Sequence, residues 1–358
     1  MTMTITLGQC MRVLEANRLA YRMLRLTSGL QLLVMERGGR ILGPFRDEDD
    51  TGLFWLNPAW ASTGDLEAFL QSGDWNLGGE RLWISPEIQY LVSDRRDFWG
   101  TVAVPAAMDP GTWRLDAPTP GQLRLRQEMT LTAYNLAVGC KSLRVERILQ
   151  AAPDPLASSS HYEALRRDVI YGGYEQVVTL AEQTTDAITS QAWSLIQLRP
   201  GGQILIPCSP HLEITDYNEP VDAAHCTHHG HWVSFKITGA RRYKVGLRAT
   251  QTFGRLGYFH PGDNGHGYLI VRSFFNNPSS LYSEEPAHLP GSRGDSIHIY
   301  NDGGMFGGFG ELEIQGQTIG GPTGRANITD QQLLWIYLGP QARLATIAAH
   351  LLGVTVAP

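Results

Sequence analysis

Cysteine, basic charge and long apolar runs are scarce in this sequence, and each scarcity excludes a class of protein. The 358 residues include four cysteines and no CxxC pair, so we expect neither a disulfide framework nor a zinc site built on such pairs. The net charge is −6 and the 29 basic residues are spread along the chain, which argues against a nucleic-acid partner. No uncharged apolar run approaches the ~18–20 residues of a membrane span, which argues against a membrane partner.

Several motifs of catalysis and cofactor binding are also missing. The sequence contains no GxSxG, no P-loop and no GxGxxG, so we expect neither a serine nucleophile of that type nor a nucleotide cofactor. The first ten residues lack a basic segment followed by an apolar one, so no signal peptide is expected. A reducing, cytoplasmic location with free thiols is therefore the default expectation.

Turn-forming residues are abundant, and the segments between them have the pattern of strands. The chain has 39 glycines and 20 prolines, and runs such as QLRLRQEMTLTAY at 122–134 alternate apolar and polar residues. A short helix is expected over 63–71, and either a helix or a final strand over 342–352. We predict an all-β fold, one domain over 1–358 with two large, mostly antiparallel sheets packed face to face.

The segment SIHIYNDGGMFGGFGELEIQGQ at 296–317 predicts a hairpin around a glycine-rich turn. Because successive side chains of a strand point to opposite faces, Leu312 and Ile314 should face the core, whereas Glu311, Glu313 and Gln315 should share the other face. Two carboxylates and an amide on one face suit acid/base catalysis or the binding of sugar hydroxyls. An ordinary solvated strand face fits the same pattern, and the sequence leaves that alternative open.

A second candidate segment is GGERLWISPE at 78–87. The paired glycines allow a tight backbone, and Arg81 and Trp83 share a face if the chain is extended there. An arginine beside an aromatic ring is a plausible site for a hydroxylated or anionic ligand. The alternative is a strand end at which Arg81 pairs with Glu80 or Glu87.

Histidines offer two further possibilities. His225, Cys226, His228, His229 and His231 are metal-ligand types, but they crowd into seven residues, so we favour a polar hairpin tip and assign no metal. The hairpin itself would be made of the segments 211–218 and 225–237. His260, expected in a loop over 254–267, could donate a proton or hydrogen-bond a sugar.

Three short motifs are GGRI at 38–41, GGERLW at 78–83 followed by Pro86 and Glu87, and LEIQ at 312–315. Together they resemble the galactose mutarotase-like superfamily, which includes the aldose 1-epimerases, and the resemblance spans roughly residues 20–340. The resemblance implies a β-supersandwich with a sugar-binding cleft on one sheet. It also implies that Glu313, in the Leu-Glu-x-Gln strand, acts as base on the anomeric hydroxyl, with Glu311 kept as a second candidate.

Two histidines expected from the resemblance are absent here, one after the glycine pair and one near 191–195. A general acid is therefore missing, and Arg81 or His260 would have to replace it. The resemblance implies an aldose 1-epimerase-like isomerase that acts on a free sugar or sugar derivative; the alternative is a non-catalytic carbohydrate-binding protein. We expect a monomer or a homodimer. The residues expected to bind the sugar are Arg81, Trp83, Glu87, Trp193, Asn301 and Asp302.

Overall fold

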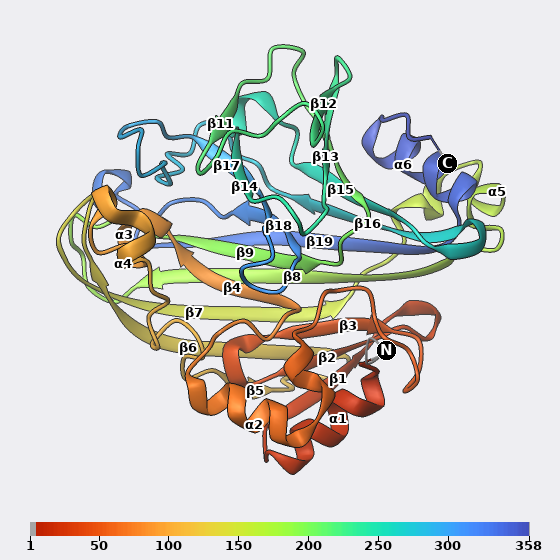
Figure 1. The fold of residues 1–358 in the computed structure, drawn as a ribbon, viewed down its shortest axis with the longest axis horizontal. Coiled ribbons are helices and arrows are strands. Elements are labelled where there is room, and N and C mark those ends of the chain that lie inside the picture. Colours follow the sequence, from red (N-terminus) through yellow and green to blue (C-terminus); the bar gives the residue numbers. More distant parts are fainter. Residues whose placement is uncertain (1–4, 358) are drawn as a thin grey trace.

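The computed structural model describes residues 5–357 and is dominated by two large antiparallel sheets (Figure 1). The first has nine strands, in spatial order β1 (Tyr21–Arg25), β2 (Gln31–Met35), β3 (Ile41–Phe45), β4 (Glu80–Ser85), β9 (Gln191–Leu198), β18 (Gly310–Gln315), β17 (Asp295–Asn301), β14 (Tyr243–Arg248) and β11 (Ile214–Asp216).

The second sheet has ten strands, in spatial order β12 (Cys226–His228), β13 (Trp232–Lys236), β10 (Gln203–Pro207), β15 (Arg255–Pro261), β16 (His266–Phe274), β19 (Asn327–Pro340), β8 (Ile170–Glu182), β7 (Gly139–Ala151), β6 (Gln122–Ala133) and β5 (Arg114–Asp116). The predicted architecture of two large antiparallel sheets is confirmed.

Helices cover the outer faces and the ends of the sheets (Figure 1). They are α1 (Leu7–Ala16), α2 (Thr63–Ser72), α3 (Glu87–Tyr90), α4 (Phe98–Thr101), α5 (Tyr162–Arg166) and α6 (Gln341–Leu352). Helix α2 begins where Ser62 accepts the backbone N–H of Asp65 and ends at Gly73, whose left-handed backbone suits glycine. The expected short helix is thus confirmed, and the segment after β19 is a helix rather than a strand.

The main core lies between the sheets, and strand alternation supplies it. In β6 the apolar side chains are buried while most of the polar ones are exposed or half-buried, as the period of two predicts. Leu312 and Ile314 of β18 belong to this core. A polar cluster is also enclosed there: the carboxylate of Glu80 lies between Arg147, 3.8 Å away, and Arg272, 3.3 Å away, and all three are buried.

Two local predictions are wrong. The segments around 211–218 and 225–237 do not pair with each other: β11 pairs with β14 in the nine-stranded sheet, while β12 pairs with β13 in the ten-stranded sheet. The segment expected as a loop over 254–267 begins with strand β15, which pairs along its whole length with β16. Both errors concern strand pairing, which the residue pattern of the segments did not specify.

Candidate functional site

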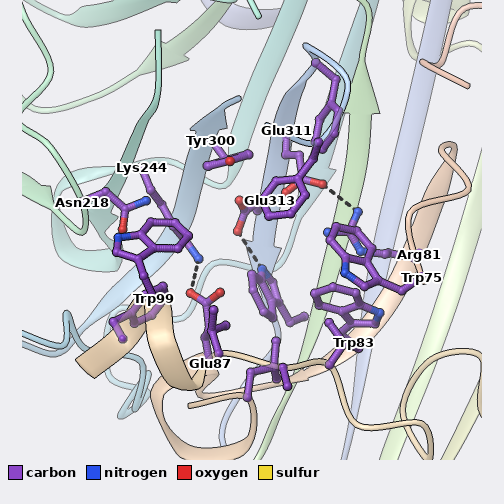
Figure 2. Close-up of a pocket in the computed structure, with 18 residues that line it drawn as sticks. Trp75, Arg81, Trp83, Glu87, Trp99, Asn218, Lys244, Tyr300, Glu311 and Glu313 are labelled. Carbon is purple, nitrogen blue, oxygen red and sulfur yellow. Dashed lines mark hydrogen bonds and ion pairs between the residues drawn. The ribbon is translucent and has the colours of Figure 1, made fainter. Parts of the chain in front are cut away.

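The Glu311–Glu313 face of β18 forms part of the wall of a cavity of about 170 Å³ on the nine-stranded sheet (Figure 2). Strand register brings its neighbours together: Tyr300 on β17 lies opposite Glu311, and Lys244 on β14 lies opposite Tyr300. The face is not solvated, since Glu311 is 5% exposed and Glu313 1% exposed. The alternative of an ordinary solvated strand face is therefore wrong. Four tryptophans line the cavity: Trp75, Trp83, Trp99 and Trp193.

Arg81 and Glu311 form a buried ion pair at 2.6 Å, although 230 residues separate them. The guanidinium carbon lies 4.1 Å from the ring centroid of Trp83 and 4.8 Å from that of Trp75. The indole N–H of Trp83 is in turn held by Asp109 at 3.0 Å. Arg81 and Trp83 thus share a face as expected, and the alternative pairing of Arg81 with Glu80 or Glu87 is wrong.

Glu313 is the least compensated carboxylate of the cavity. Its Oε2 accepts the indole N–H of Trp193 at 2.8 Å, and its buried Oε1 has no hydrogen-bond partner among the described residues. Burial raises the pKa of Glu313 to about 7, the charge of Lys244 opposes this, and the charges of Glu311 and Glu87 add to it. A carboxylate with a pKa near neutrality and one free oxygen is suited to take up a proton from a ligand.

Lys244, which the sequence analysis did not single out, supplies the second cation of the cavity. Its Nζ lies 2.6 Å from Oε2 of Glu87 (Figure 2). The same atom lies 4.6 Å from the ring centroid of Trp193. Burial lowers the pKa of Lys244, but the carboxylates of Glu87, Glu313 and Glu284 outweigh burial and raise it. The lysine therefore remains an ammonium ion.

Glu284 adds a third carboxylate behind this pair. It accepts the backbone N–H of Glu87 and is 1% exposed. Burial raises the pKa of Glu284 to about 8, with the charge of Lys244 opposing the shift. Glu87, Glu284 and Glu313 thus surround a single ammonium, and a group of that composition retains a proton near neutral pH.

Three of the predicted site residues lie outside the cavity lining. His260 is on β15 of the ten-stranded sheet, where its Nε2 lies 2.9 Å from the carbonyl oxygen of Pro200 and its ring stacks on Tyr268. Asn301 accepts the backbone N–H groups of Thr238 and Gly239. These two residues are thus engaged in holding the fold.

Asp302 stabilises the glycine-rich turn between β17 and β18. Its Oδ2 accepts the backbone N–H groups of Gly304, Phe306 and Gly308, at 2.8 to 3.1 Å. Phe306 lines the cavity and its carbonyl accepts the side-chain amide of Asn76. Asp302 therefore shapes the cavity through this turn, without lining it.

The histidines do not supply the acid that the resemblance leads one to expect. His298 lies directly opposite Glu313 on β17, but it is fully buried and does not line the cavity. Burial, with a contribution from Lys244, holds its pKa well below the usual value, so the ring is neutral. No histidine of residues 5–357 lines this cavity.

The segment His225–His231 makes hydrogen bonds and stacking contacts. His225 lies 2.7 Å from Asp222, and the ring of His229 stacks on Trp232 at 3.6 Å between centroids. Over residues 5–357, no group of three or more His, Cys, Asp or Glu side chains is arranged to hold a metal ion. Cys10, Cys140, Cys208 and Cys226 are free thiols.

A family model for a family of unknown function, DUF6786, matches residues 31–358. The chain belongs to this family. No curated protein sequence matches it. In the part of the chain that the structure describes, no helix is both long and apolar enough to cross a membrane.

Solved structures with a similar course of the chain were also found. A candidate aldose 1-epimerase from Escherichia coli K12 has a TM-score of 0.48 and 12% identity, covering 88% of this chain and 99% of that one. A galactose mutarotase-like protein from Lactobacillus casei ATCC 334 has a TM-score of 0.47 and 11% identity, covering 89% and 100%. The predicted resemblance to galactose mutarotase-like proteins is confirmed at the level of the fold. No activity follows from it.

Proposed function

We propose that this member of the family is a carbohydrate-active protein that binds a small free sugar in the cavity and interconverts its anomers, with Glu313 as the base. The observation that carries the proposal is the state of Glu313, a buried carboxylate that lines a tryptophan-rich cavity. Its pKa is about 7, and its buried Oε1 has no hydrogen-bond partner among the described residues. Such a group takes a proton from a hydroxyl, which is the first step of anomer exchange.

The chemistry needs one base and one acid. Glu313 removes the proton of the anomeric hydroxyl while the ring oxygen receives a proton, and the bond between the anomeric carbon and the ring oxygen breaks. Rotation of the resulting aldehyde and closure of the ring return both protons, so the reaction is balanced without a cofactor. The Lys244–Glu87 pair, in place of the missing histidine, is the acid in this proposal, because it presents the cavity with an N–H donor of high charge.

The walls of the cavity support a sugar as the ligand. Sugars expose apolar C–H faces that lie well on indole rings, and their hydroxyls need polar partners at the rim of such a face. Here Trp83 and Trp193 are in edge contact at 5.7 Å, and Glu313 accepts from one of them. The small volume of the cavity suits a monosaccharide better than a long chain.

A binding protein without catalysis is the second candidate. The absence of a cavity-lining histidine within residues 5–357 favours it, since general acid catalysis contributes roughly 10²–10⁴-fold. The two candidates make the same complex and differ only in its chemistry.

The test is a panel of common aldoses, each followed from a pure anomer by polarimetry and, in parallel, by calorimetric titration. Acceleration of anomer exchange for at least one sugar supports the isomerase. Saturable binding with exchange as slow as in buffer supports the binding protein. Neither binding nor acceleration across the panel contradicts both.

A further inference from the structure

The cations around the cavity are all engaged by carboxylates and by tryptophans of the protein itself. Arg81 is paired with Glu311 at 2.6 Å and stacks on Trp75 and Trp83. Lys244 is paired with Glu87 at 2.6 Å and lies over Trp193. Among the described residues that line the cavity, no other side chain carries a positive charge.

The same arrangement is found at the mouth of the cavity, which we define by Trp99, an exposed lining residue. The guanidinium of Arg242 stacks on Trp99 at 4.1 Å, and Glu219 accepts from it at 2.6 Å. All four cavity tryptophans therefore have a protein cation on one ring, and each of these cations has its own carboxylate. Aromatic rings that already face a cation offer less to a cationic ligand, and cations that are already paired offer less to an anionic one.

The two lining cations face three lining carboxylates, which are Glu87, Glu311 and Glu313. The Arg81–Glu311 pair is the more isolated of the two ion pairs, since Lys244 also feels Glu313 and Glu284. Loss of Glu311 would therefore leave Arg81 without an ionic partner among the described residues. Arg81 lines the cavity, and its guanidinium is a planar group with several N–H donors.

We propose that Glu311 is a specificity residue: by occupying the guanidinium of Arg81 it excludes acidic sugars, such as uronates and sugar phosphates, from the cavity. This assignment deepens the proposed function, on which it rests, and separates the roles of the two carboxylates of β18. Glu313 has a free oxygen and acts on the ligand, whereas Glu311 acts on Arg81.

An acidic sugar meets two obstacles in the wild-type cavity. It brings a negative charge next to the uncompensated carboxylate of Glu313. In addition, the charge of the guanidinium that would pair with it is already neutralised by Glu311, which accepts from its Nη1. Replacing Glu311 by glutamine removes one negative charge and leaves a side chain of nearly the same shape. Arg81 remains positioned by Trp75 and Trp83, so its fork is presented to the cavity ready to bind a carboxylate or a phosphate.

The experiment measures binding of three matched pairs by calorimetry: glucose and glucuronate, galactose and galacturonate, glucose and glucose 6-phosphate. In the wild type each acidic member should bind at least about tenfold more weakly than its neutral parent, and in Glu311→Gln at least one acidic member should gain about tenfold or more. A merely structural role for Glu311 would weaken both members of a pair together and would give no gain.

Two controls isolate the cause. Glu219→Gln removes the same charge from the pair at the mouth, where Glu219 is 47% exposed, and should give no gain. The double variant Glu311→Gln/Arg81→Gln should lose the gain, because the guanidinium that binds the acid is gone. A gain that survives in the double variant would overturn the assignment.

The outcomes separate this inference from the proposed function. If the acidic sugars bind the wild type as tightly as their neutral counterparts, the inference is overturned, while a sugar site remains. This comparison uses only the wild type and does not depend on the folding of any variant. Gain of acid binding in Glu311→Gln without neutral sugar binding to the wild type would support the inference and contradict the proposed function. Binding of no member to either protein would overturn both.

Discussion

Trp193 on β9 donates its indole N–H to Oε2 of Glu313 on the adjacent strand β18, at 2.8 Å, while the buried Oε1 of the same carboxylate has no partner within residues 5–357. One oxygen is thus fixed by the protein, and the other makes no hydrogen bond to the described residues. The pKa of Glu313, raised to about 7 by burial, leaves part of the population ready to accept a proton at neutral pH.

The rate of anomer exchange should rise with pH through about 7. A base must be unprotonated to act, and burial raises the pKa of Glu313 to that value. The effect on stability has the opposite sign. The folded state holds a proton on Glu313 over the range from about 4.3, the value for an unfolded glutamate, to about 7, so this group lowers stability as pH rises through that range.

Rates measured between pH 5 and 9 check the first part, and urea denaturation at the same pH values checks the second. The stability contribution should be absent in Glu313→Gln, which cannot titrate. A rate that falls as pH rises through 7 would be inconsistent with a carboxylate base.

Trp193→Phe should shift the pH profile to higher pH. The hydrogen bond from the indole N–H lowers the pKa of Glu313, and phenylalanine removes this donor while keeping an aromatic ring. Trp83→Phe is the matched control, because its N–H is bound to Asp109 instead. Equal shifts in both variants would mean that Trp193 acts only through packing.

Lys244→Met should remove the proposed acid and so lower the rate of anomer exchange by about 10²-fold or more. It should also move the remaining pH profile to higher pH and destabilise the fold. The positive charge of Lys244 opposes the rise in the pKa of Glu313, and the buried Lys244 pairs with the half-buried Glu87. Breaking this pair should therefore cost less than the about 3–5 kcal/mol of a fully buried pair. The double variant Lys244→Met/Glu87→Gln should recover much of that stability in urea denaturation, and a double variant less stable than Lys244→Met would refute the pairing.

Glu80→Gln should destabilise the protein by about 3–5 kcal/mol, because it leaves Arg147 and Arg272 buried without their shared carboxylate. Glu80 also accepts from Tyr174 at 2.5 Å, so the network that joins the two sheets loses its centre. Glu219→Gln, at an exposed pair, should cost no more than about 1 kcal/mol. Chemical denaturation at pH 7 compares the two, and equal effects would contradict this account of the inter-sheet network.

The local pattern of apolar and polar residues predicted much of the fold and part of the site. Leu312 and Ile314 face the core and Glu311 and Glu313 face the cavity because a strand alternates with a period of two, which can be read from five residues. Likewise the extended backbone at 80–85 puts Arg81 and Trp83 on one face.

What could not be predicted depends on register and on loops. Lys244 reaches the cavity because β14 pairs with β17 so that Lys244 lies opposite Tyr300, and no local pattern specifies that pairing. Glu284 lies outside any helix or strand. His260 was expected in a loop because turn-forming residues such as Pro261, Gly262 and Asp263 follow it directly, but it lies on strand β15. Asn301 and Asp302 were expected to bind ligand, but turn backbone groups bind their side chains instead.

The most direct test of the central claim is anomer exchange by the wild type and by Glu313→Gln, measured by exchange NMR on the sugar that the panel identifies, with binding measured on the same samples. We predict that Glu313→Gln still binds the sugar and loses about 10²-fold or more of the acceleration. Exchange by the variant at the rate of the wild type would contradict the assignment of Glu313 as the base.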